Sequence, residues 1–154
     1  MINNDILRRI RFVFDYKNAK MIKIFAKVKH EMELNTLLDL LKKEAEEGYK
    51  PCNDKTLCLF LDGLIIEKRG LKEGAEIPEP VSQLNNNLIF KKLRVALELR
   101  EDDILSALAL ADFNMSKSEL GALFRKPGHK HFKECGDQVL RNFLTGLSIQ
   151  HRGK

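Results

Sequence analysis

The residue types best suited to chemistry gather in one segment near the end of the chain. Residues 125–137 read Arg-Lys-Pro-Gly-His-Lys-His-Phe-Lys-Glu-Cys-Gly-Asp and hold two of the four histidines, a cysteine and two carboxylates. Imidazole, thiolate and carboxylate groups ligate metals, and a basic loop also suits an acidic ligand. We predict a ligand or partner surface here, with the candidate residues Arg125, His129, Lys130, His131, Lys133, Asp137 and Arg141.

Metal binding and thiol chemistry are alternative interpretations of the same segment. They would use His129, His131, Cys135 and Asp137. A His-x-His pair needs further ligands fixed elsewhere, and the sequence offers none, so we predict no metal and no cofactor. Cys135 and Cys52 lie just before predicted helices, where the pKa of a thiol can fall, but neither has a cysteine partner at redox spacing. We interpret both as small buried groups.

No known catalytic signature accompanies these residues. The chain lacks a phosphate-binding Gly-rich loop, a nucleophile elbow and an HExxH motif. Its adjacent carboxylates, such as Asp102-Asp103, are typical of solvated helix ends. The sequence therefore favours a non-enzymatic binding or regulatory module with a protein or small-molecule partner.

The candidate segment belongs to the second copy of an internal repeat. A shift of 83 positions aligns residues 3–70 with residues 86–153 without a gap, and 20 of the 68 aligned pairs are identical. A gapless match of this length indicates duplication. We predict one repeat unit at residues 1–70, a second at residues 86–154, and a linker at residues 71–85, which contains two prolines and three glutamates.

Each copy shows four stretches of helical periodicity and no convincing strand pattern. We therefore predict an all-α protein of two tandem, pseudo-symmetric four-helix units packed into one compact body. Ser116 and Glu119 predict a capping box at the third helix of the second copy. We further predict Asn4 and Asn87 as N-caps of the first helices, Asp54 and Asp137 as N-caps of the fourth, and Gly70 and Gly153 as C-caps.

Gly63 and Gly146 recur in the middle of the fourth helix. Glycine at such a position costs about 1 kcal/mol relative to alanine, so its recurrence needs a structural reason. We predict that another helix approaches closely there and that the two units pack together through their fourth helices.

The pattern Cys-x-Asp-x-x-Leu-x-x-Phe-Leu-x-Gly-Leu occurs at residues 52–64 and again at residues 135–147. With Arg-Lys-Pro-Gly-His-Lys at residues 125–130 and Glu-Lys-Arg-Gly at residues 67–70, the chain resembles the YehS-like bacterial proteins over essentially its whole length. The resemblance implies a tandem helical architecture and a bacterial cytoplasmic setting. It implies no activity, cofactor or catalytic residue.

Nucleic acid is the alternative partner. The net charge of +5 and the pI near 9.1 permit an acidic ligand. Residues 102–126 outline a helix-turn-helix-like hairpin, although the usual turn glycine is missing. The residues that would contact phosphate are Lys91, Lys92, Arg94 and Lys117. Acidic residues follow Arg11 and Arg94 four positions later, which is typical of an ordinary solvated helix face.

The sequence also predicts a cytoplasmic protein without a membrane partner. No apolar run approaches the length of a membrane-spanning helix, and the first residues do not resemble a signal peptide. Three cysteines without CxxC spacing predict free thiols rather than disulfides. The sequence does not specify an oligomeric state.

Overall fold

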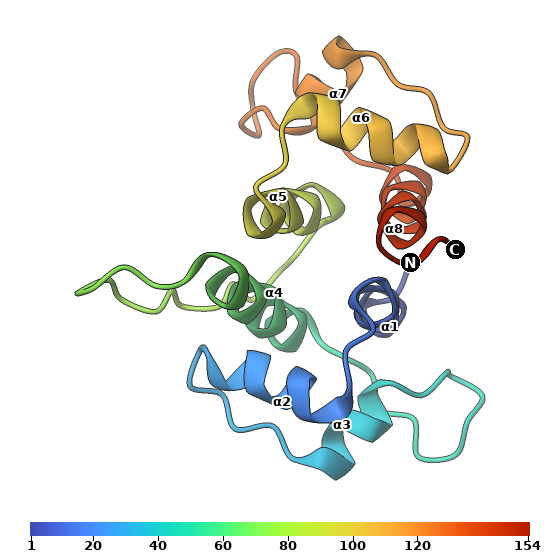
Figure 1. Cartoon of the computed structure of the whole chain (residues 1–154). Helices are drawn as coiled ribbons and strands as arrows, with labels where there is room; N and C mark the ends of the chain where they lie inside the picture. Colours follow the sequence, from blue (N-terminus) through green and yellow to red (C-terminus); the bar gives the residue numbers. More distant parts are fainter. The chain divides into compact units, whose positions relative to one another are not determined.

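The computed structural model describes residues 1–154 and contains eight α-helices and no strand, which confirms the all-α prediction (Figure 1). Each copy of the repeat supplies four helices. They are α1 (Asn3–Phe14), α2 (Asn18–Ala26), α3 (Leu34–Leu40) and α4 (Asp54–Arg69), followed by α5 (Asn86–Leu97), α6 (Glu101–Leu110), α7 (Lys117–Leu123) and α8 (Asp137–Arg152). The chain forms two compact units, residues 1–84 (unit 1) and residues 85–154 (unit 2).

The last helix of each unit is the element on which the first two helices pack. In unit 1, α4 contacts α1 and α2, and α3 packs on α2; in unit 2, α8 contacts α5 and α6, and α7 packs on α6. Residues 57–64 of α4 are all buried, so the helix is covered around most of its circumference. A helix that is apolar on most sides needs neighbours on most sides, which explains its central place.

The two cores share a position for one phenylalanine and exchange the position of a second. Phe60 and its counterpart Phe143 are both fully buried. In unit 1 the ring of Phe25 in α2 lies 5.3 Å from that of Phe60, whereas in unit 2 the ring of Phe90 in α5 lies 4.5 Å from that of Phe143. The repeat therefore pairs Leu7 and Phe25 with Phe90 and Leu108, which conserves the summed volume of these two core positions.

Gly63 and Gly146 mark a close helix approach, but the neighbour differs from the one predicted. A Cβ atom on Gly63 would overlap the carbonyl oxygen of Ile24, and one on Gly146 would overlap that of Ala107. The approaching helices are thus α2 and α6 of the same units. The prediction that these glycines join the two fourth helices is wrong, because each unit's second helix already occupies that space.

Several predicted N-caps are displaced by a residue or more. Helix α1 begins after Ile2 and α5 after Asn85, so Asn4 and Asn87 lie inside the first turn rather than at the cap. The fourth helices begin after Asn53 and Gly136, which makes Asp54 and Asp137 their first residues. Negative charge in a first turn still favours the helix dipole, which explains why the sequence pattern resembled a cap.

Other predicted helix ends are confirmed. The Ser116 hydroxyl accepts from the Glu119 amide, and the Glu119 carboxylate accepts from the Ser116 amide, each over 3.0 Å. Gly70 and Gly153 follow their helices with φ of +76° and +75°, values that favour glycine.

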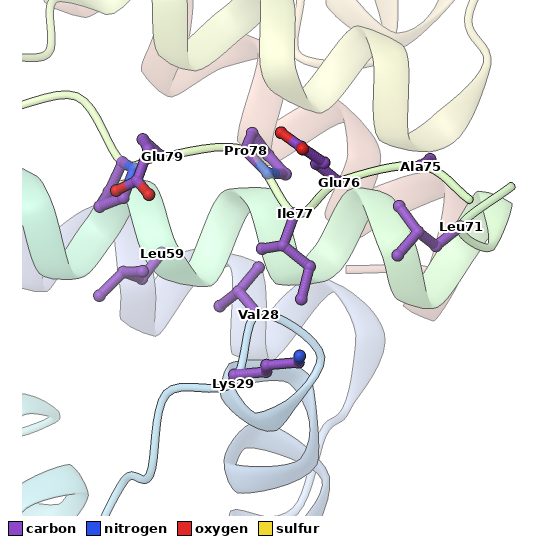
Figure 2. Close-up of a pocket in the computed structure, with 10 residues that line it drawn as sticks. Val28, Lys29, Leu59, Leu71, Ala75, Glu76, Ile77, Pro78 and Glu79 are labelled. Carbon is purple, nitrogen blue, oxygen red and sulfur yellow. The ribbon is translucent and has the colours of Figure 1, made fainter. Parts of the chain in front are cut away.

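The segment between the two helical repeats contains no helix and lies against unit 1. Figure 2 shows Ile77 directed from this segment toward Val28, in a cleft of about 450 Å³ that α4 also lines through Leu59. The Leu84 amide donates to the Asp54 carboxylate over 2.8 Å. The segment is therefore held at its apolar middle and at its end.

We expect Gly146→Ala to destabilise the protein by about 2 kcal/mol, because its Cβ would force α6 away from α8. Gly121→Ala is the matched control, since Gly121 also lies inside a helix but has open space beside it. Gly121→Ala should raise the free energy of unfolding by up to about 1 kcal/mol, because alanine favours a helix more than glycine does. Chemical denaturation measures both; equal effects of the two variants would contradict the close approach.

Candidate functional site

A single half-buried asparagine, Asn87, holds both ends of the candidate loop in unit 2. The Asn87 amide nitrogen donates to the carbonyl oxygens of Leu123 and Lys133, over 2.9 and 2.8 Å. Its side-chain oxygen accepts from the Cys135 amide over 2.9 Å. This one side chain therefore connects α5 to the end of α7 and to the approach to α8.

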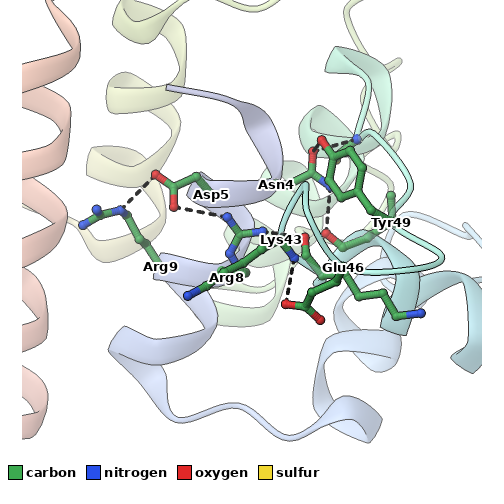
Figure 3. A network of polar contacts seen from close by, with 10 residues as sticks. Asn4, Asp5, Arg8, Arg9, Lys43, Glu46 and Tyr49 are labelled. Atoms are coloured by element: carbon green, nitrogen blue, oxygen red, sulfur yellow. Dashed lines mark hydrogen bonds and ion pairs between the residues drawn. The ribbon is translucent and has the colours of Figure 1, made fainter.

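Unit 1 repeats the arrangement atom for atom. The Asn4 amide donates to the carbonyls of Leu40 and Lys50, and its oxygen accepts from the Cys52 amide. The Tyr49 hydroxyl adds one more donor to the same oxygen, over 3.2 Å (Figure 3). Because the same contacts occur in both units, they belong to the hydrogen-bonded frame that both units share and are not specific to one site.

The neighbouring asparagine explains the repeated Cys-x-Asp pattern. The Asn86 amide donates to the Cys135 carbonyl over 3.0 Å and to the Asp137 carboxylate over 2.7 Å. Asn3 makes the same two contacts in unit 1, at the same distances. Asp137, one of the predicted site residues, therefore positions the start of α8.

The cysteines of this pattern are buried and poorly nucleophilic. Cys52 and Cys135 each expose 6% of their surface, and all three cysteines are free thiols. Burial, with a smaller contribution from Asp54, raises the pKa of Cys52 to about 12. Burial, with a smaller contribution from Asp137, raises the pKa of Cys135 to about 11. Thiolate is the reactive form, so neither residue is primed for nucleophilic or redox chemistry near pH 7.

The candidate loop forms one wall of a cleft of about 650 Å³ in unit 2, and α7 forms the other. The cleft is lined by Met115, Ser118, Glu119, Ala122, Leu123, Arg125, Lys130, His131, Phe132, Lys133, Glu134 and Val139. Four of the seven predicted residues are therefore brought together: Arg125, Lys130, His131 and Lys133. The other three, His129, Asp137 and Arg141, do not line the cleft.

The cleft combines basic side chains with apolar walls. Its apolar lining includes Met115, Phe132 and Val139, which the sequence interpretation did not select. Met115 and Phe132 lie in loops, where no periodicity marks them, and Val139 lies in the first turn of α8, where helical spacing describes core residues equally well. Glu119 is occupied at the helix start, where hydrogen bonds from Ser116 lower the pKa of its carboxyl group. Basic groups therefore outnumber the acidic ones available to a ligand.

The two histidines of the loop support its turn. The His131 amide donates to Nδ1 of His129 over 3.0 Å, and the two imidazole rings lie 5.6 Å apart. This contact engages the Nδ1 atom of His129 within the turn. No group of three or more His, Cys, Asp or Glu side chains is arranged to hold a metal ion.

Unit 1 places different chemistry at the equivalent positions. Lys42 corresponds to Arg125, and its Nζ lies 2.9 Å from the Asp39 carboxylate. In unit 2 the position of Asp39 is taken by Ala122, so Arg125 lacks this partner. The same frame therefore carries an internally paired cation in unit 1 and a cation directed to the cleft in unit 2.

The residues of the nucleic-acid alternative are separate from the cleft. The Arg94 Nε donates to the Leu99 carbonyl over 3.1 Å, and its guanidinium lies 4.6 Å from the Phe124 ring centre. Lys117 lies 3.2 Å from the Asp102 carboxylate. Lys91 and Lys92 lie on α5. The predicted recognition helix, α7, has seven residues and ends before Arg125 and Lys126.

The fold and the cleft define a class of protein: a tandem helical repeat in which two units share a frame and differ in one loop. The family model for a protein of unknown function, DUF1456, matches residues 3–70 and again residues 86–153. The uncharacterized protein YehS of Escherichia coli (strain K12) is 44% identical over 154 residues, which cover 100% of this chain and 99% of that protein. The chain therefore belongs to the DUF1456 family, and the resemblance to YehS-like proteins is confirmed.

No solved structure matches the chain. None of its helices is both long enough and apolar enough to cross a membrane.

We expect Asn87→Ala to lower the free energy of unfolding by about 2–3 kcal/mol, because it leaves two carbonyls and one amide without their partner. Asn114→Ala is the control, since Asn114 is exposed in the same unit and should change stability by less than about 0.5 kcal/mol. Urea denaturation measures both. Similar stabilities of the two variants would show that the loop does not depend on Asn87.

We expect the native protein to resist alkylation by iodoacetamide at pH 8. Cys52 and Cys135 are held as thiols by their raised pKa values, and Cys58 is fully buried beside Asp62. Intact-mass spectrometry should show little labelling of the folded chain and three labels after denaturation. Rapid labelling of Cys135 in the folded protein would restore the thiol interpretation.

Proposed function

We propose that the protein is a non-enzymatic binding module whose binding surface is the cleft of unit 2, and that the cleft takes an acidic segment of a protein partner. The observation that carries the proposal is the gathering of Arg125, Lys130, His131 and Lys133 around apolar walls in a single cleft. Basic groups at a rim attract and orient an acidic partner, whereas apolar walls supply most of the affinity.

The contacts around the cleft favour binding over catalysis. The buried thiol of Cys135 has a raised pKa, and Asp137 accepts a hydrogen bond from Asn86 at the start of α8. Glu119 accepts the Ser116 amide at the start of α7. The thiol of Cys135 and the carboxylates of Asp137 and Glu119 are therefore engaged in contacts that hold the backbone.

The hydrogen bonds that hold the loop at Lys133 use its backbone and not its basic side chain. Lys133 is tied through its backbone alone: its amide donates to the Ala122 carbonyl over 3.0 Å, and its carbonyl accepts from Asn87. Its side chain is exposed, and its charge makes only a small contribution to lowering the pKa of Glu119 at the start of α7. The side chain can therefore be changed here without removing either of these backbone hydrogen bonds.

We expect a synthetic peptide of alternating glutamate and leucine to bind the cleft and to shift the amide resonances of Ala122, Phe132 and Val139. Lys133→Glu should weaken that binding about fivefold, which corresponds to about 1 kcal/mol. Lys50→Glu is the matched control, because Lys50 occupies the equivalent position of unit 1. Equal effects of the two variants, or shifts confined to unit 1, would contradict the proposal.

Nucleic acid remains the alternative ligand, supported by the net charge of +5. If an oligonucleotide binds and the peptide does not, and if Lys91→Glu with Lys92→Glu abolishes the binding, the surface on α5 is the relevant one. A steep loss of affinity with salt would accompany that outcome.

A further inference from the structure

The third helix and the loop around it carry opposite charge in the two units. Residues 31–50 contain six acidic and three basic side chains, a formal net charge of −3. The equivalent residues 114–133 contain one acidic and five basic side chains, a formal net charge of +4. The frame beneath the two segments is the same, so this difference lies in the surfaces that they present.

The third helix of unit 1 also exposes two leucines. Leu34 and Leu38 lie one turn apart on α3, and they expose 48% and 39% of their surface. Residues four positions apart share one face of a helix, so the two form a single apolar stripe. Unit 2 has Lys117 and Gly121 at these positions, which removes the stripe.

Acidic residues flank this stripe along the chain. Glu31 and Glu33 lie three positions and one position before Leu34, and both are exposed. Beyond the helix, Glu46 turns back to accept the Lys43 amide over 3.1 Å, which folds the acidic loop at the end of α3 (Figure 3). Glu44 and Glu47 are exposed in the same loop. Together, α3 and the loops on both sides of it expose five glutamates and two leucines, and we call this set the acidic leucine surface: Glu31, Glu33, Leu34, Leu38, Glu44, Glu46 and Glu47.

We propose that the acidic leucine surface of one molecule docks into the basic cleft of unit 2 of a second copy of this chain. The inference rests on the proposed function of the cleft and names its partner. Leu34 and Leu38 meet the cleft walls formed by Met115, Phe132 and Val139. The flanking glutamates meet the basic groups of the loop, which include Lys130 and Lys133.

The contact is head-to-tail, because the two surfaces differ in charge and in composition. Two acidic leucine surfaces repel each other, and so do two basic clefts, which disfavours pairing of identical surfaces. Repeated contacts between two different surfaces form a closed ring only if the rotation that relates neighbouring molecules returns to its starting point. Otherwise they form an open chain of molecules. A duplicated chain carries both partners of such a contact at equal concentration.

Sedimentation velocity at about 200 µM tests the inference, since this concentration populates a contact with a Kd of about 10–100 µM. At low salt the wild-type protein should sediment above the monomer mass of 17.7 kDa, and it should return to that mass at high salt. A single monomeric species at low salt would overturn the inference.

Charge-reversed variants identify the surfaces. Glu44→Lys with Glu47→Lys, and separately Lys130→Glu with Lys133→Glu, should each be monomeric. An equal mixture of the two double variants should associate again, because the first retains the basic cleft and the second retains the acidic leucine surface. Glu73→Lys with Glu76→Lys, in the segment after α4, is the control and should associate like the wild type. A mixture that stays monomeric would contradict the pairing of these two surfaces.

The peptide titration separates this inference from the proposed function. A chain that binds the acidic peptide in its cleft but stays monomeric retains the proposed function and loses the self-association. A chain that does neither loses both.

Discussion

The side-chain amide of one asparagine per unit is the constraint on which the rest of each unit depends. Asn4 and Asn87 each supply two donated hydrogen bonds and one accepted one, and these join the first helix to the chain on both sides of the long loop. Aspartate lacks the donors, and glutamine is one methylene longer, so neither reproduces the geometry. The third helix is short, and its position depends on this polar contact as much as on packing.

With that frame fixed, the two units diverged in separate ways in the core and at the surface. In the core, unit 1 has Leu7 and Phe25 where unit 2 has Phe90 and Leu108, so the phenylalanine comes from a different helix in each unit and both interiors stay filled. At the surface, unit 2 has Ala122 where unit 1 has Asp39, so Arg125 has no counterpart of the ion pair between Lys42 and Asp39, and it lines the cleft. The two units thus share an architecture while this loop differs between them in its charged side chains.

The sequence alone predicted the repeat, the helices and those helix ends whose chemistry is local, such as the box formed by Ser116 and Glu119. It misplaced the role of Asn4 and Asn87, because their partners lie 36 to 48 residues away and leave no local pattern. For Gly63 and Gly146, spacing identified the crowded face but not the neighbour that crowds it. The cleft could be predicted only in part, since Phe132 and Val139 resemble core residues until the loop is seen to open beside them.

The two hydrogen bonds that Asn87 donates at the base of the loop make this loop useful for protein engineering. Because Asn87 binds the chain at Leu123 and again at Lys133, the exposed residues 125–131 between these points are anchored at both ends and lie outside the helices. Such a stretch suits the insertion of foreign peptides. A peptide inserted between the two anchoring points would be presented on a helical scaffold with its two ends held at fixed positions. The duplicated chain offers two such positions, which makes it a template for bivalent recognition.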